Sequence, residues 1–205
     1  MPVVVVVNPK GGVGKSTLAT QVAGYFAAQH QRVMLGDADR QQSCKLWLSL
    51  RPDSARPIAS WTVDPDDIAR PPKGTTHVVL DTPAGLRGKR LKEVLKLAHK
   101  VLVPLQPSVF DICATRDFLD ELTGSSHAAK TQIGLIGMRV DERTRAAEQL
   151  RQFVESVGLP TLAYLRSTQI YIGLAGRGLT LFDLAPERMA RDLAQWQPIC
   201  RWLDQ

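Results

Sequence analysis

The segment NPKGGVGKST, at residues 8–17, limits the possible fold more than any other part of the chain. It follows an unbroken apolar run at residues 3–7, which is typical of a strand buried on both faces, and it overlaps the start of a helix-like segment at residues 16–30. Its glycines allow main-chain N–H groups to turn inward around an anion, and the helix directs its positive N-terminus at the same point. The segment therefore predicts a phosphate-binding loop between a strand and a helix.

The polar residues of this loop predict a nucleotide and Mg²⁺ as ligands. In such a loop Lys15 contacts the β- and γ-phosphates, the Ser16 hydroxyl coordinates Mg²⁺, and Thr17 lies near the α-phosphate. The general pattern G-x-x-x-x-G-K-[ST] is not met, because Pro9 stands in place of its first glycine. The chain instead has the narrower pattern K-G-G-x-G-K-[ST], which adds a second lysine, Lys10. The remaining loop residues expected to bind the nucleotide are Gly11, Gly12, Val13 and Gly14.

Strand-like and helix-like segments alternate along the rest of the chain, without an internal repeat. This alternation predicts an α/β fold with a mostly parallel sheet covered by helices on both faces. The length of 205 residues suits a single domain, residues 1–205. Residues 51–76 are rich in proline and polar groups and are expected to form a surface excursion. Further strands are expected at residues 32–39, 77–85, 100–108, 131–139 and 159–165, and further helices at 85–100, 111–122, 143–158 and 186–196.

Composition and charge limit the expected cellular location and the expected kind of partner. Three cysteines without metal-ligand spacing, and the absence of a signal-like N-terminal segment, favour a cytoplasmic protein with reduced thiols. No apolar run approaches the roughly 18 residues of a membrane-spanning helix. The net charge of +6 favours a polyanionic partner, although charge alone decides little.

Three segments together resemble the ParA/MinD family of deviant Walker A ATPases. KGGVGKST resembles the family's nucleotide-binding signature, GDADRQQS its second motif, and VVLDTPAG its Walker B segment. The resemblance covers most of the chain and implies a P-loop fold, ATP as the nucleotide, Mg²⁺-dependent hydrolysis and a face-to-face homodimer formed with ATP. It also implies that Lys10 reaches across the dimer to the nucleotide of the other subunit, while Lys15 binds the nucleotide of its own.

Three aspartates, Asp37, Asp39 and Asp81, are candidates for binding Mg²⁺ and for catalysis. Asp81 ends a buried strand, where open α/β sheets place ligand groups, and it can hold Mg²⁺ through water. Asp37 and Asp39 are two residues apart, so an extended segment would place both on one side. By resemblance, Asp39 orients the attacking water and Asp37 supports the Mg²⁺ shell. Arg40 replaces the proline usual in this motif.

Other segments have weaker signals. Thr82, Pro83 and Gly85 are expected to form a switch that responds to the γ-phosphate. Asp111 lies where the family places a dimer-interface loop, but it is equally suited to cap a helix. The resemblance points to Met138, Arg139 and the segment after Leu165 as the adenine pocket.

Basic residues are concentrated between residues 85 and 100, with further arginines in the last third of the chain. Charged helix faces are usually only solvated. The family, however, binds DNA without sequence preference as ATP-bound dimers, which doubles a modest basic patch. The residues of the first stretch are Arg87, Lys89, Arg90, Lys92, Lys96 and Lys100, and the later arginines are Arg143, Arg145, Arg151, Arg166, Arg177, Arg188 and Arg191.

These features favour a ParA-type ATPase that drives plasmid or chromosome partition as a cytoplasmic, nucleoid-associated protein. Its expected partner is a ParB-type or other centromere or cargo adaptor that stimulates hydrolysis, and a helix-turn-helix extension is not expected. One alternative is the positioning of a protein cargo by the same cycle. A second is a small-molecule ligase or kinase on the same fold, which normally lacks the lysine at position 10.

A third alternative is a membrane-associated ATPase of the MinD type. Met189, Leu193, Trp196 and Cys200 lie on one face of the last helix-like segment, but Pro198 interrupts it and its charges are balanced. Core packing explains this apolar stripe better than membrane binding, so no membrane partner is expected. An iron protein of the nitrogenase type is disfavoured, because the contexts of Cys44 and Cys113 do not match its cluster ligands.

Overall fold

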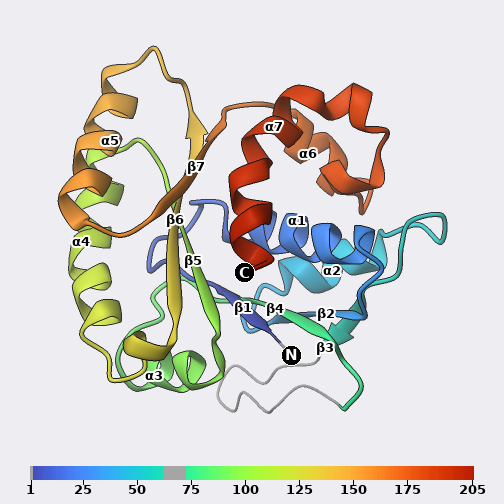
Figure 1. Ribbon diagram of the computed structural model, residues 1–205, viewed down its shortest axis with the longest axis horizontal. Coiled ribbons are helices and arrows are strands. Elements are labelled where there is room, and N and C mark those ends of the chain that lie inside the picture. Colours follow the sequence, from blue (N-terminus) through green and yellow to red (C-terminus); the bar gives the residue numbers. More distant parts are fainter. Residues whose placement is uncertain (1, 62–72) are drawn as a thin grey trace.

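Seven strands form one parallel sheet in the computed structural model of the chain, which describes residues 2–61 and 73–205 (Figure 1). Their order is β3-β2-β4-β1-β5-β6-β7, so β1 is central. Every neighbouring pair is parallel. The strands are β1 (Val3–Val6), β2 (Val33–Asp37), β3 (Ala59–Trp61), β4 (His77–Asp81), β5 (Lys100–Leu105), β6 (Gln132–Val140) and β7 (Thr161–Arg166).

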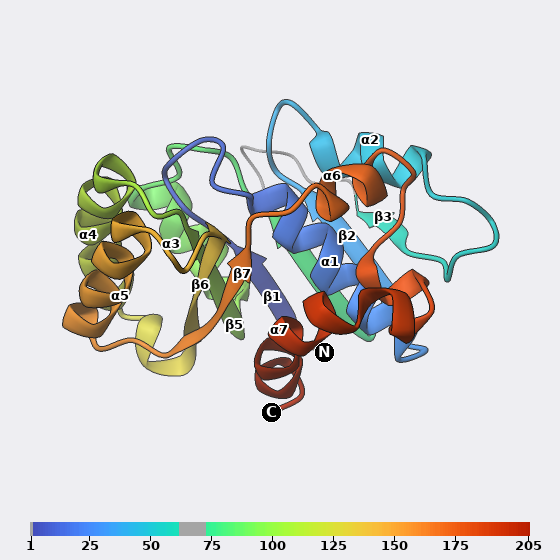
Figure 2. The same cartoon turned by 90° about the horizontal axis from the view of Figure 1, so that it is seen from above.

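Helices cover both faces of this sheet. The α-helices are α1 (Lys15–Ala28), α2 (Ser43–Ser49), α3 (Gly88–Leu97), α4 (Val109–Thr123), α5 (Arg145–Val157), α6 (Ile170–Ala175) and α7 (Pro186–Leu203), and two 3₁₀ turns are η1 (Ala128–Lys130) and η2 (Leu181–Asp183). Seen from above, α3, α4 and α5 lie on one side of the strands and α1, α2, α6 and α7 on the other (Figure 2). The predicted fold class is confirmed.

The alternation of β1 explains how one apolar run supports two cores. Val3, Val5 and Val7 pack in the core beneath α3, α4 and α5, whereas Val4 and Val6 pack in the core beneath α1. All five side chains are buried. Successive strand residues point to opposite faces, so a strand between two helical layers needs apolar residues at every position.

The C-terminal helix differs from its sequence prediction. It continues through Pro198 to Leu203 rather than ending near residue 196. A proline inside a helix costs about 3 kcal/mol or more, but Ile199 and Trp202 beyond it are buried against the core. Lys100 at the start of β5 also donates hydrogen bonds to the main-chain oxygens of Trp202 and Leu203.

The apolar stripe of α7 packs inside the molecule. Trp196 is buried, and Met189, Leu193 and Cys200 pack against the same core. The core-packing interpretation of this stripe is therefore confirmed. None of the described helices has the length and apolar character needed to cross a bilayer.

Three of the described strands and α-helices have no counterpart in the sequence prediction: α2, α6 and β3. β3 lies within residues 51–76, so this segment is more than a surface excursion; it adds an edge strand to β2. Residues 62–72 of the same segment lie outside the described residues. The side chain of Asp111 in α4 also lies outside them, so its two interpretations stay open.

Candidate functional site

The glycine-rich loop connects the central strand β1 to α1, as predicted (Figures 1 and 2). Gly12 and Gly14 have φ angles of 77° and 98°, which residues with side chains rarely adopt. Gly14 is the N-cap of α1, and a Cβ placed on it would lie 3.0 Å from Cε of Met138. The backbone conformation therefore favours glycine at position 14, whereas the contact is with the flexible end of the Met138 side chain.

Lys15 is buried at the first turn of α1. Only 8% of it is exposed, and its Nζ donates a hydrogen bond of 2.7 Å to the main-chain oxygen of Lys10. Burial lowers the pKa of Lys15, while the charges of Asp81 and Asp39 act in the opposite direction. The structure thus places one amine inside the loop and near two carboxylates; its contact with phosphates stays a prediction.

The main chain of Lys10 connects the two lysines. Its N–H donates to Oδ1 of Asn8 at 2.8 Å, and its carbonyl accepts the amine of Lys15. The side chain of Lys10 is half-buried. Its reach into a second subunit stays a prediction.

Hydrogen bonds tie the loop to the ends of the two strands beside β1. Nδ2 of Asn8 donates to the oxygen of Pro104 at 2.8 Å, and Nε2 of Gln106 donates to the oxygen of Gly12 at 2.9 Å. The N–H of Gly85, after β4, donates to the oxygen of Pro9 at 2.8 Å. The loop is therefore held from the β4 side and from the β5 side.

The predicted switch residue Thr82 is also anchored to the central strand. Its Oγ1 donates to the oxygen of Val6 at 2.8 Å, and the residue is buried. Pro83 is half-buried and Gly85 is exposed. The segment after β4 thus begins in the core and emerges beside the glycine-rich loop.

Asp37 and Asp39 have different surroundings. Asp37 ends β2; its Oδ1 accepts the N–H of Asp39 at 2.9 Å and its Oδ2 accepts the N–H of Cys44 at 2.8 Å. Burial raises the pKa of Asp37, against these main-chain donors. Asp39 is half-buried, and its Oδ1 accepts the N–H of Gln41 at 2.9 Å. The chain bends after Asp37, so the expected extended segment through Asp39 is wrong.

Asp81 is the most buried carboxylate of the site, with 1% exposed. Its Oδ2 accepts the thiol of Cys44 at 3.3 Å, and its Oδ1 has no hydrogen-bond partner within the described part of the chain. Burial raises the pKa of Asp81 to about 6, although hydrogen bonding by Ser16 and Cys44 lowers it. An unpartnered buried oxygen close to a second buried aspartate, Asp37, fits a divalent cation. The residues predicted to bind Mg²⁺ are thus brought together.

Cys44 also lies at this site, although no pattern in the sequence indicates it. It is fully buried, and its sulfur and one carboxylate oxygen each from Asp37 and Asp81 all lie within 4.8 Å of one another. The sequence offers no metal-ligand spacing around Cys44, because the three residues come from β2, α2 and β4. Only the crossover topology brings them together.

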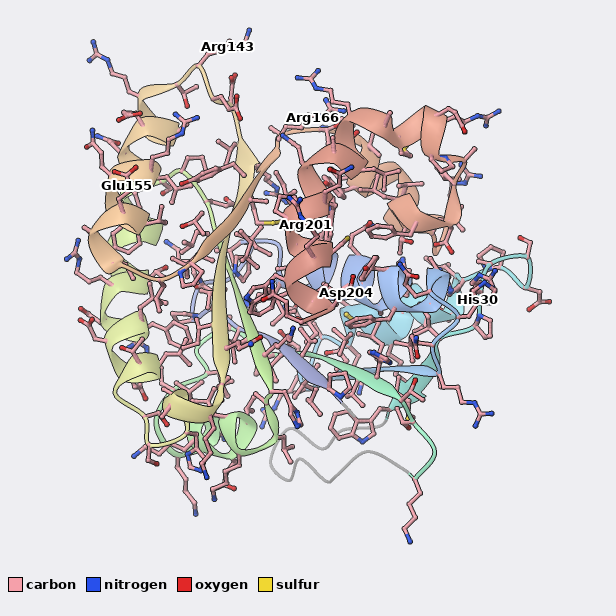
Figure 3. All side chains as sticks on the ribbon, in the orientation of Figure 1. His30, Arg143, Glu155, Arg166, Arg201 and Asp204 are labelled. Atoms are coloured by element: carbon pink, nitrogen blue, oxygen red, sulfur yellow. The ribbon has the colours of Figure 1, made fainter. Side chains whose placement is uncertain are left out.

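The adenine prediction concerns the segments after β6 and β7, and it stays a prediction. A hollow of about 520 Å³ lies where the segments after β6 and β7 meet α7, and Arg143 and Arg166 lie at this edge (Figure 3). Met138 and Arg139 do not line it: Met138 is buried under Gly14, and Arg139 is exposed with a φ of 52°. The hollow is lined by Val140, Asp141, Glu142, Arg143, Arg166, Ser167, Arg191 and Gln195.

The basic residues of the stretch from Arg87 to Lys100 divide into exposed and buried ones. Lys89, Arg90, Lys92 and Lys96 are exposed on α3, where Lys96 pairs with Glu93 at 2.7 Å. Lys100 is 6% exposed and holds the end of α7, so its expected contact with DNA is wrong.

Several of the arginines are paired with acids. Arg166 donates to both oxygens of Asp192, Arg143 pairs with Asp141, Arg151 pairs with Glu148, and Arg87 lies 3.7 Å from Glu121. These pairs reduce the positive charge available to a polyanion. The largest group of exposed basic residues on one element is therefore that of α3.

The chain matches known proteins over most of its length. The CobQ/CobB/MinD/ParA nucleotide binding domain matches residues 4–181. Maintenance of carboxysome distribution protein A from Gloeobacter kilaueensis is 27% identical over 209 residues, covering 98% of this chain and 94% of the relative.

Solved structures share the fold. MinD from Pyrococcus horikoshii, complexed with Mg-ADP, has a TM-score of 0.77 at 15% identity, over 100% of this chain and 96% of the other. A variant of McdA from Cyanothece, in complex with ATP, has a TM-score of 0.71 at 15% identity, over 97% and 96%. At these identities the similarity shows the fold alone.

Proposed function

Because the chain belongs to the CobQ/CobB/MinD/ParA nucleotide-binding domain family, we propose that it is a ParA-type ATPase. In this proposal it binds ATP with Mg²⁺, dimerises in the ATP-bound state and positions a cargo over DNA. The observation that carries the proposal is the pair of lysines at one loop: Lys15 is buried at the start of α1, and Lys10 supplies the carbonyl that holds its amine. A metabolic ligase needs only Lys15 and normally lacks the lysine at position 10.

Each residue of the site has a role in this cycle. The inward N–H groups of the glycine-rich loop and the amine of Lys15 bind the phosphates. Mg²⁺, when bound, neutralises charge on the β- and γ-phosphate oxygens. Ser16, Asp37 and Asp81 hold that ion, and Asp39, on the bend after β2, orients the attacking water. Lys10 binds the nucleotide of the partner subunit.

The similar proteins of known name favour one kind of cargo. The chain is 27% identical to a carboxysome distribution protein over 98% of its length, whereas its match to ParA from Rhizobium radiobacter covers 54% of the chain. This difference favours a protein cargo over plasmid or chromosome partition, reversing the order that the sequence alone favoured. Plasmid partition stays the second candidate, because the ParA match is 29% identical where it aligns.

A variant that binds ATP but hydrolyses it slowly can be used to identify the cargo. Affinity capture of the Asp39→Ala variant with ATP from its native cells should recover an adaptor protein. An adaptor attached to a protein assembly supports the first candidate, and an adaptor that binds a specific DNA site supports the second. Recovery of neither an adaptor nor DNA would contradict cargo positioning.

Asp39→Ala is expected to bind ATP normally and to hydrolyse it about 100-fold more slowly or worse, because a group that positions the attacking water typically contributes that much. The variant removes the carboxylate without altering the glycine-rich loop. Single-turnover hydrolysis and calorimetry separate the two effects. Asp53→Ala, on an exposed turn after α2, is the matched control. Turnover like that of the natural chain would transfer the role to another carboxylate, first Asp37.

Duplex DNA of unrelated sequences should bind with similar affinity, because contacts to phosphates carry no sequence information. Binding should require ATP, since one subunit offers the basic group of α3 only once and a dimer offers it twice. It should weaken about tenfold or more between about 50 and 200 mM salt if about three phosphates are neutralised. Fluorescence anisotropy in ATP, ADP and no nucleotide measures this. Joint replacement of Lys89 and Lys92 by glutamate should remove binding, whereas Lys45→Glu on α2 should not.

Two other outcomes of this titration would change the proposal. Equal DNA binding in all nucleotide states would separate DNA binding from the ATP cycle. Preferential binding to anionic vesicles would favour a membrane-associated ATPase, and no binding to either polyanion would favour a metabolic enzyme.

A further inference from the structure

A cysteine lies in the middle of the cation site. Cys44, in the first turn of α2, has no exposed surface, and its thiol donates to Oδ2 of Asp81 at 3.3 Å. Its N–H donates to Asp37, so the residue contacts both buried aspartates. The position of the sulfur is fixed by α2, which begins at Ser43.

A second observation at this place also points to a cation. Oδ1 of Asp81 is buried and lacks a hydrogen-bond partner among the residues described here. Two buried carboxylates within 4.8 Å of each other repel when both are ionised, and one positive ion relieves that repulsion. Lys15 supplies one positive charge near Asp81, and a cation bound between Asp37 and Asp81 would face both carboxylates directly.

The donor set selects the kind of ion. One sulfur and two carboxylate oxygens suit zinc-like cations, whereas Mg²⁺ prefers oxygen ligands alone. Ligand atoms of a tetrahedral zinc site are about 3.5 Å apart. The sulfur and Oδ2 of Asp81 are already at 3.3 Å, and no pair of the three ligand atoms exceeds 4.8 Å. Small side-chain movements are therefore enough to complete three ligands.

We propose that the nucleotide-free protein binds one thiophilic divalent cation of the zinc class through Cys44, Asp37 and Asp81. The thiol proton leaves to solvent as the metal–sulfur bond forms, and no electrons are transferred. Water completes the fourth position. This binding does not depend on ATP hydrolysis; only its competition with Mg-nucleotide rests on the proposed function.

Cadmium, a spectroscopic substitute for zinc, provides the test. Titration of the metal-free natural chain with Cd²⁺ should produce an ultraviolet sulfur-to-cadmium charge-transfer band that saturates at one equivalent. Cys44→Ser keeps the size of the side chain and a donor for Asp81, and it should lose the band. Its cadmium affinity should fall by about 100-fold or more, because changes outside the first shell of a metal already cost about 10- to 100-fold. Cys200→Ser should keep both the charge-transfer band and the cadmium affinity, since Cys200 is part of α7 and packs against the core beneath α1.

Each other outcome overturns the proposal. A natural chain without the saturable band has no such site, and a band that persists in Cys44→Ser places the metal on another thiol. If Cys44→Ser fails to fold, the double variant Cys113→Ser and Cys200→Ser decides, because Cys44 is then the only cysteine of the chain and the band should remain.

Competition separates this proposal from the proposed function. Saturating Mg-ADP should displace cadmium if the two sites overlap as argued. A band that is unaffected by Mg-ADP would move the proposed Mg²⁺ site elsewhere and overturn the shared use of Asp37 and Asp81. Failure of ATP hydrolysis, in contrast, would leave the cadmium result unchanged.

Discussion

Lys15→Ala is expected to lower the affinity for both ATP and ADP by about 100-fold or more. The amine is buried beside the glycine-rich loop, where its charge-assisted hydrogen bonds to phosphate oxygens contribute about 1.5–3 kcal/mol each. Loss of two such bonds removes about 3 kcal/mol or more, and about 1.4 kcal/mol corresponds to tenfold in affinity. Isothermal calorimetry with Mg-ADP measures the effect on the monomer directly.

Lys45→Ala is the matched control for this variant. Lys45 is an exposed lysine on α2 that donates to Gln42, and its removal should leave nucleotide affinity unchanged. Thermal denaturation without nucleotide shows whether Lys15→Ala is folded, since the variant also loses the bond to the oxygen of Lys10. A folded variant that binds Mg-ADP as tightly as the natural chain would refute the phosphate role of Lys15.

Lys10→Ala is expected to bind ADP within about twofold of the natural chain but to lose ATP-dependent dimerisation and most hydrolysis. The contacts of residue 10 with Asn8 and Lys15 use its main chain, so alanine retains both. The substitution therefore tests the side chain while these two main-chain contacts remain. Loss of a charge that binds phosphate across an interface typically costs about 2–5 kcal/mol, which is enough to separate two subunits at micromolar concentration.

Sedimentation velocity with ATP and with ADP decides this prediction. The natural chain should be dimeric only with ATP, and Lys10→Ala should be monomeric with both. The Lys45→Ala control should dimerise as the natural chain does. A Lys10→Ala variant that dimerises normally would restrict this lysine to a role within its own subunit.

The sequence predicts those parts of the fold in which local pattern and buried position agree. Val3 to Val7 form an unbroken apolar run and occupy the centre of the sheet, where both faces are covered. Gly12 and Gly14 adopt the positive φ angles that only glycine tolerates easily. In both cases the residue type alone limits the local structure strongly.

Other features depend on contacts between distant segments, which the sequence does not contain. β3 is only three residues long, and its pairing with β2 defines it. Pro198 predicts the end of a helix, but α7 continues past it because Trp196 before it and Ile199 after it are both buried in the core. Lys100 reads as part of a basic surface, although its amine is held by the end of a helix about 100 residues later.

The bond between Lys15 and the oxygen of Lys10 also determines an order of events. The amine that contacts this oxygen is the one proposed to bind phosphate. A nucleotide that draws the amine away leaves the peptide at residue 10 without this partner and allows it to reorient. The side chain proposed to meet the second subunit is carried by that same residue. Each subunit should therefore bind its own nucleotide before it dimerises. The rate of dimer formation should then be limited by nucleotide binding and not by the encounter of two subunits.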